Sequence, residues 1–160
     1  MEYPFADRMS GLQASAIREI LKFTADPTVI SFAAGNPAPE AFPIEDVRRI
    51  TAEILSEEPV AALQYSVTEG YAPLRALVRE DLKARCRIGS EQDDIVITAG
   101  AQQAIELTCK TLCNPGDVVL CENPSFVGSL NSFKSYEGRL VGVPVEADGI
   151  SIAALEQALE

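Results

Sequence analysis

Apolar positions change their spacing part-way along the chain. Before residue 92 they recur every three or four residues, which predicts helices over 11–23, 44–57 and 70–85, with one short strand over 29–33. After residue 92, short apolar runs alternate with helical patterns, which predicts strands over 95–98, 118–121 and 140–145 and helices over 101–113, 126–136 and 152–159. Alternation of this kind is typical of βαβ units, so we expect an α/β fold with a mainly parallel sheet.

Capping residues and apolar stripes support these helices. Ser10 and Ser151 are placed to cap the first and last helices, and Ile150 and Leu155 are spaced as a hydrophobic staple. Pro73 falls in the first turn of its helix, where proline is tolerated. The helix over 70–85 is expected to bury a stripe made of Leu74, Leu77, Val78 and Leu82.

The turn at Gly100 joins a predicted strand directly to a predicted helix. The first amides of a helix have no partner within it and carry the positive end of the helix dipole, so they can bind a phosphate without a charged side chain. Gly100, Ala101 and Gln102 would supply these amides. A small residue at such a turn can also serve close packing alone, and the turn by itself does not decide between the two.

Composition and charge exclude several classes of function. The 160-residue chain has a formal net charge of −11 and 47% hydrophobic residues, so we expect a globular protein that binds neither nucleic acid nor an anionic membrane surface. It has no apolar run long enough to span a bilayer and no signal-peptide pattern, so we expect it in the cytoplasm. The absence of histidine removes Ser-His-Asp and Cys-His nucleophiles from consideration.

The cysteines lack the paired Cys-x-x-Cys spacing of a zinc site, and no histidine completes one, so no metal site is expected. We expect all of them to be reduced and in or near the core, as is usual for small thiols on a helix face. They are Cys86, Cys109, Cys113 and Cys121.

Several motifs occur together in one order. They are 31–37 (SFAAGNP), 63–70 (LQYSVTEG), 73–75 (PLR), 98–103 (TAGAQQ), 115–117 (PGD) and 122–126 (ENPSF). With these motifs the chain resembles the N-terminal part of fold-type I pyridoxal-phosphate enzymes, the aspartate aminotransferase superfamily, and above all its 2-aminoadipate and kynurenine aminotransferase-like branch. The resemblance implies part of a three-layer α/β/α large domain with an N-terminal helical segment. It divides the chain into a dimer-facing segment, 1–60, and the first half of the cofactor-binding domain, 61–160.

The resemblance also implies a site for pyridoxal 5'-phosphate. The turn 100–102 would hold the phosphate, and Phe126 would stack on the pyridine ring, where many relatives have tyrosine. Tyr65 would cross a homodimer interface to the partner's cofactor phosphate, and Gly35 would leave room beside the substrate carboxylate. The residues alone leave other roles open: Phe126 as plain core, Tyr65 as a buried tyrosine with a local partner, and Gly35 as a simple turn glycine.

Transamination requires a lysine that bonds to the cofactor and an acidic residue at the pyridine nitrogen. In the family, both lie downstream of every motif present here. The lysines of this chain are Lys22, Lys83, Lys110 and Lys134. Only Lys134 precedes a Gly-Arg pair as the family lysine does, but it follows the ENPSF motif too soon and falls on the solvated side of its helix, so we reject it. We therefore expect no catalytic residue in this chain, and an arginine for the substrate's α-carboxylate is missing as well.

These motifs predict a fragment of an aminotransferase that exchanges an amino group between an amino acid and a 2-oxo acid, and that is inactive by itself. The three predicted strands leave an open sheet edge, as expected for the front of a larger domain. Two alternatives stay open. One is a non-catalytic ligand-sensing module of the kind found in transcription regulators, and the other is a pyridoxal-phosphate lyase or synthase on the same scaffold.

Overall fold

The computed structural model describes residues 4–11, 23, 26, 28–30, 32, 35 and 37–160. They form two compact units, one of residues 4–11 with 98–160 and one of the described residues between 20 and 97. The predicted helix over 11–23 lies outside the described residues except for its two end residues. Of the predicted strand over 29–33, Val29, Ile30 and Phe32 are described, and they are not in a strand. The predicted domain boundary at residue 60 stays a prediction.

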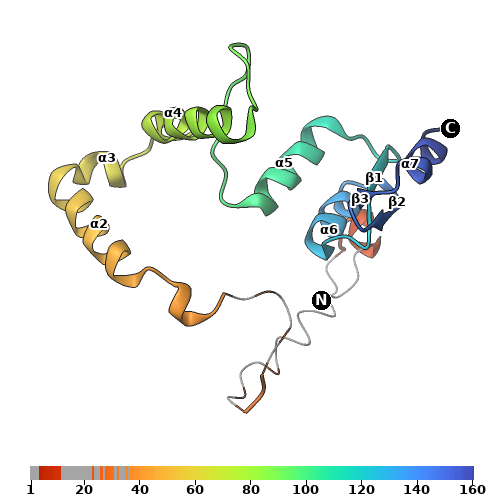
Figure 1. Ribbon diagram of the computed structural model, residues 1–160, viewed down its shortest axis with the longest axis horizontal. Helices are drawn as coiled ribbons and strands as arrows, with labels where there is room; N and C mark the ends of the chain where they lie inside the picture. Colours follow the sequence, from red (N-terminus) through yellow and green to blue (C-terminus); the bar gives the residue numbers. More distant parts are fainter. Residues whose placement is uncertain are drawn as a thin grey trace. The chain divides into compact units, whose positions relative to one another are not determined.

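The sheet of the first unit is built from the predicted βαβ segment (Figure 1). β1 (Val118–Asn123) and β2 (Arg139–Glu146) pair in parallel, with Val118 opposite Arg139. β3 (Gly149–Ile150) pairs antiparallel with the end of β2 across a two-residue turn. The sheet has the order β1-β2-β3, and its parallel pairing of β1 with β2 agrees with the predicted βαβ unit, whereas β3 adds an antiparallel edge.

Three helices accompany this sheet: α5 (Ala101–Leu112), α6 (Val127–Ser135) and α7 (Ile152–Leu159). α6 connects β1 to β2 and contacts β2, α7 also contacts β2, and α5 contacts α6. The core lies where these elements meet. Its buried residues, within the part of the chain that the structure describes, are Cys109 of α5, Ser132 of α6 and Val143 of β2.

Ser151 stands at the start of α7, as predicted, but its side chain makes no capping hydrogen bond. The backbone secures the helix start instead. The Ser151 amide donates to the Pro144 carbonyl at 2.8 Å, and the Leu155 amide donates to the Ser151 carbonyl at 2.9 Å. Because Pro144 belongs to β2, the first bond ties the start of the helix to the sheet.

The second unit is helical in its regular parts, which are η3 (Pro39–Ala41), α2 (Ile44–Glu57), α3 (Pro59–Leu63), α4 (Ala72–Asp81) and the π-helical turn η4 (Leu82–Cys86). α2 has the predicted bounds, and α4 with η4 covers most of the helix predicted over 70–85. α2 ends where Glu58 precedes Pro59, because the residue before a proline is disfavoured in the helical conformation. The short helix α3 that follows is not foreseen by the sequence pattern.

Residues 95–98 do not form the strand that the sequence predicts. The apolar alternation is present, since Ile95 and Ile97 are half-buried and Val96 is 60% exposed. A strand also requires a ladder of hydrogen bonds to a neighbouring strand, and none of the described residues supplies one. The Ile97 amide donates instead to the Glu69 carbonyl, at 2.9 Å.

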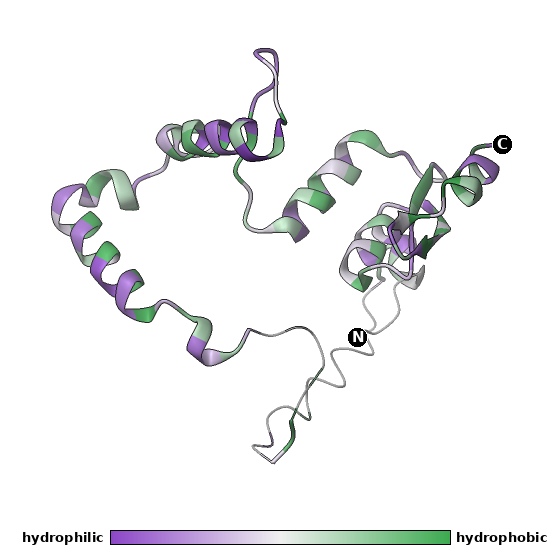
Figure 2. Ribbon diagram, in the orientation of Figure 1, coloured by the Kyte–Doolittle hydropathy of each residue, from purple (hydrophilic) through white to green (hydrophobic). Residues whose placement is uncertain are grey.

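Apolar faces of the second unit are exposed. Figure 2 shows α2 with a hydrophilic and a hydrophobic side, the segregation that its sequence predicts. In α4 the expected stripe is only partly covered, because Leu74 and Leu77 are 42% and 64% exposed while Val78 and Leu82 are half-buried. None of the described helices is both long enough and apolar enough to cross a membrane.

The cysteines divide by position. All four are free thiols, but Cys86 is exposed, which contradicts its expected place in or near the core. It falls at the end of the exposed turn η4, whereas the other three belong to the unit that contains the sheet. Burial raises the pKa of the Cys109 thiol, and the neighbouring Cys113 adds to that effect.

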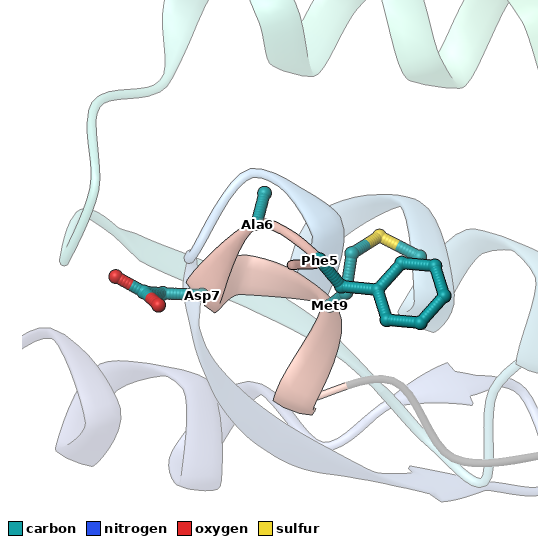
Figure 3. A pocket seen from close by; sticks show the side chains of 4 residues that line it. All are labelled: Phe5, Ala6, Asp7 and Met9. Atoms are coloured by element: carbon teal, nitrogen blue, oxygen red, sulfur yellow. The ribbon is translucent and has the colours of Figure 1, made fainter. Parts of the chain in front are cut away.

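A short 3-10 helix, η1 (Asp7–Gly11), contacts α6 in the first unit. Phe5 and Met9 lie side by side in a hollow lined also by Ala6 and Asp7, and the Asp7 carboxylate points away from the two apolar side chains (Figure 3). Phe5 is 81% exposed, so this hollow is shallow.

Candidate functional site

Gly100 is the residue before α5. It has a φ of 84° and a ψ of 168°, a backbone conformation that favours glycine. Two local hydrogen bonds shape the turn: the Gly100 amide donates to the Thr98 carbonyl at 2.9 Å, and the Ala99 amide donates to Oε1 of Gln103 at 2.6 Å. The amides of Ala101 and Gln102 donate to no group in the described part of the chain. Of the three predicted donors, these two are therefore free at the start of α5.

Phe126 stands at the carboxyl end of β1, where parallel α/β sheets bind their ligands. It is the residue before α6, with a φ of −68° and a ψ of 123°. Phe126 is 65% exposed, so it is not part of the core of the described residues, and its role at a cofactor stays a prediction. An exposed aromatic face here is available to another ring.

The side chain of Gln102 joins the first turn of α5 to α6. Its Nε2 atom donates to the Gly128 carbonyl at 3.2 Å and to Oγ of buried Ser132 at 2.6 Å. Both acceptors belong to α6, so the first turn of α5 is held along α6 from its second to its sixth residue. The predicted turn 100–102 and Phe126 are thereby brought into one site within a single unit.

Gly128 lies at the centre of this arrangement. A Cβ atom built on it would lie 2.4 Å from Cε1 and 2.8 Å from Cζ of Phe126, and 2.6 Å from Oε1 of Gln102. All three distances are below 3.0 Å, which Cβ atoms in proteins essentially never show. The Phe126 ring and the Gln102 amide therefore occupy space that any other residue at position 128 would fill.

Tyr65 and Gly35 belong to the other unit. Tyr65 is 98% exposed, so it is not buried within the described residues. Gly35 lies in a turn at a φ of 60°, and a Cβ atom there would have no neighbour within 4 Å. The turn role predicted as its alternative agrees with this conformation, and the roles of both residues at a cofactor site stay predictions.

Arg75 has a structural role in the second unit. Its guanidinium is 21% exposed, donates to the Ile95 carbonyl at 2.7 Å and pairs with Asp94. Arg79 reaches the same Asp94 carboxylate at 3.0 Å. Hydrogen bonds from the Ile95 amide and from Arg75 lower the pKa of Asp94. The cluster fastens α4 to the segment 93–97, and it was not foreseen because its partners are about twenty residues apart.

In the ranges that the structure describes, no three His, Cys, Asp or Glu side chains gather as metal ligands would. Burial, followed by the charge of Glu106, raises the pKa of Tyr136. Positive potential at the site therefore comes from the helix N-termini, since the lysines of α5 and α6, Lys110 and Lys134, stand in the last turns.

Comparison with known proteins gives the family. The family model of "Aminotransferase class I and II" matches residues 27–160. The chain belongs to the class I and II aminotransferases. This confirms the resemblance carried by the sequence motifs, and with it the α/β fold class of pyridoxal-phosphate-dependent aminotransferases.

Two curated aminotransferases are among the similar sequences. Aromatic-amino-acid aminotransferase 1 of Thermococcus litoralis is 40% identical over 156 residues, 98% of this chain and 37% of the relative. The 2-aminoadipate transaminase of Thermus thermophilus is 45% identical over 149 residues, 93% of this chain and 36% of the relative. The chain thus spans little more than a third of the length of these aminotransferases.

A solved structure agrees with these sequences. Kynurenine aminotransferase of Pyrococcus horikoshii, crystallised with PMP, KYN as substrate and KYA as product, superposes with a TM-score of 0.88 at 37% identity. The match covers 97% of this chain and 38% of that one. Aminotransferases of this family use pyridoxal phosphate, in agreement with the cofactor that the motifs imply.

Proposed function

We propose that the protein carrying this chain is a pyridoxal-phosphate-dependent aminotransferase that moves an amino group from an amino acid to a 2-oxo acid. The observation that carries the proposal is the joint placement of free amides and an exposed ring where α5 and α6 begin. A phosphate suits this place because the amides of Ala101 and Gln102 are free and a Cβ at Gly100 would meet nothing within 4 Å. A pyridine ring suits the exposed face of Phe126.

Each residue of the site then has a distinct task. The α5 amides bind and orient the phosphate, and Phe126 holds the plane of the heterocycle by stacking without a hydroxyl group. Tyr65 serves the partner subunit of a homodimer, and Gly35 leaves room for the substrate carboxylate. The chemistry supplied by bound pyridoxal phosphate is an electron sink for the bonds at the substrate's α-carbon.

This chain alone is proposed to be inactive, because neither lysine of α5 and α6 is placed for the reaction. Lys110 is nine residues after Ala101 on α5, which at 1.5 Å per residue puts it about 13 Å further along the helix axis. Lys134 is seven residues after Val127 on α6, about 10 Å along that axis, and it is exposed. A cytoplasmic location and a role in amino acid metabolism complete the proposal.

The phosphate-binding role of α5 can be tested by Ala101→Pro in the whole protein. Ala101 is the first residue of α5, where proline fits, so the substitution removes one amide donor and preserves the helix. A hydrogen bond to a charged group contributes about 1.5 to 3 kcal/mol, so the dissociation constant for pyridoxal phosphate should rise about 10- to 150-fold. The matched control is Ala101→Ser, which keeps the amide and should bind as the unchanged protein does.

Activity is measured with pyridoxal phosphate, an amino acid donor and 2-oxoglutarate. Amino-acid-dependent conversion of the oxo acid by the whole protein supports an aminotransferase, and release of ammonia or loss of a substituent without an oxo acid acceptor supports a lyase instead. Equal binding by Ala101→Pro and Ala101→Ser would refute the phosphate role of α5. Steady transamination by the purified 160-residue chain would refute its proposed inactivity.

A further inference from the structure

We propose that Gly128 is a positioning residue that sets the orientation of the Phe126 ring for the cofactor, an inference that rests on the proposed function. Gly128 is the second residue of α6 and has no positive φ, so its backbone conformation does not call for glycine. Glycine is also a poor helix former, because it loses more backbone freedom than any other residue. The reason for glycine at this position must therefore lie in the space around it.

That space is filled from two sides. The edge of the Phe126 ring comes within 2.4 Å of where a Cβ on Gly128 would stand, and Oε1 of Gln102 comes within 2.6 Å. The ring approaches from the residue before α6, and the amide approaches from the first turn of α5. Because Gly128 has no side chain, the Phe126 ring and the Gln102 side chain of α5 can both lie close to the α6 backbone at residue 128.

The two contacts differ in what holds them. The Gln102 amide is fixed by hydrogen bonds to the Gly128 carbonyl and to Ser132, so it has a defined place without the ring. Phe126 has no polar atom, and its ring is 65% exposed, so only packing defines its orientation. A tyrosine could anchor its ring through its hydroxyl, but Phe126 depends on the open space at Gly128.

The expected effect of Gly128→Ala follows from this difference. Because the Phe126 ring is largely exposed, it can rotate away from a new methyl group, and α6 itself need not unfold. The substitution should therefore leave the fold nearly intact and disturb the ring. A merely structural glycine would give the opposite result, with lost stability and an unchanged cofactor environment.

The experiment uses the whole protein with pyridoxal phosphate as the probe. The dissociation constant and the visible circular dichroism of the bound cofactor are measured for Gly128→Ala, with thermal unfolding as a check of the fold. The constant should rise about three- to tenfold, as expected for the loss of an aromatic stacking contact, and the dichroism band should change. Lys134→Ala, on the exposed side of the same helix, is the control and should change neither.

Two further backgrounds assign the effect to the ring. In Gln102→Ala, the effect of Gly128→Ala should persist, because the contact with the ring remains. When Phe126→Ala and Gln102→Ala are combined, adding Gly128→Ala should produce no further loss of binding, because both groups that its methyl would meet are gone. If Gly128→Ala alone fails to fold, the combination with both of these substitutions should restore folding by removing both collisions.

The outcomes separate this inference from the proposed function. Absence of pyridoxal phosphate binding by the unchanged protein would refute the proposed function, and this inference with it. Binding by the unchanged protein, with the same constant and the same dichroism in Gly128→Ala, would overturn the inference alone. The inference would also be overturned by loss of the Gly128→Ala effect in the Gln102→Ala background, or by a variant with all three substitutions that still fails to fold.

Discussion

Gly70→Ala should destabilise the protein far more than Gly89→Ala, although the two glycines have nearly the same φ. Their φ values are 107° and 102°, a region that side chains rarely adopt, and such strain costs about 1 to 3 kcal/mol in each variant. The surroundings differ. A Cβ at Gly70 would lie 2.8 Å from both Cβ and Cγ1 of Ile97, whereas a Cβ at Gly89 would meet nothing within 4 Å.

The difference between the variants isolates the collision with Ile97. Forcing a methyl group into packed surroundings costs about 1 to 3 kcal/mol, so Gly70→Ala should lose about 2 to 6 kcal/mol in all and Gly89→Ala about 1 to 3 kcal/mol. Changes in the freedom of the unfolded chain are the same for both and cancel in the comparison. The Cβ of Ile97 cannot swing aside by rotation of its side chain, so relief requires movement of the backbone.

Urea unfolding of the whole protein measures both free energies, and amide hydrogen exchange locates the damage. In Gly70→Ala, exchange should accelerate at the Ile97 amide, which donates to the Glu69 carbonyl at 2.9 Å. In Gly89→Ala that amide should keep its protection. Equal losses of stability in the two variants, or unchanged exchange at Ile97 in Gly70→Ala, would show that the close approach of these two segments is not what requires glycine.

Three further predictions concern charge, packing and stacking. The pKa of Asp94 lies below its ordinary value of 3.8, so its contribution to stability is complete above pH 3.8 and is lost as the pH falls through the lowered pKa. NMR titration of the carboxyl should show that midpoint, and Arg75→Ala should raise it; an unmoved midpoint would contradict the pairing. Val143→Ala, at a residue only 3% exposed, should cost about 1.5 to 2.5 kcal/mol in urea unfolding, and a loss below 0.5 kcal/mol would deny it a core role. Phe126→Tyr should keep pyridoxal phosphate affinity within about threefold while Phe126→Leu weakens it, and equal binding by Leu would argue against stacking.

Local sequence features predict the elements well where their ends are set by local chemistry. α2 has the predicted bounds because an apolar stripe of period 3.6 gives its extent and because Pro59, after Glu58, ends it. The parallel pairing of β1 with β2 follows from the helix between them, since a crossover of that kind joins parallel strands. The strand predicted over residues 95–98 is absent, because alternating apolar residues show which side chains a strand would bury and not whether another strand pairs with it.

The site was predicted in its parts but not in its assembly. The free amides of α5 and the ring of Phe126 belong to motifs that lie within a few residues of a turn, so the sequence alone identifies them. What joins them is the bond between Gln102 and Ser132, thirty residues apart, and the space at Gly128, which no pattern of apolar residues reveals. The motif assigned Gln102 one task, through its backbone. The structure gives its side chain a second one, because the residue whose amide is proposed to bind a phosphate also fastens α6, the helix that follows Phe126. A substitution of Gln102 that keeps the amide therefore still disturbs the site, through α6, and the two tasks separate only when backbone and side-chain variants are compared.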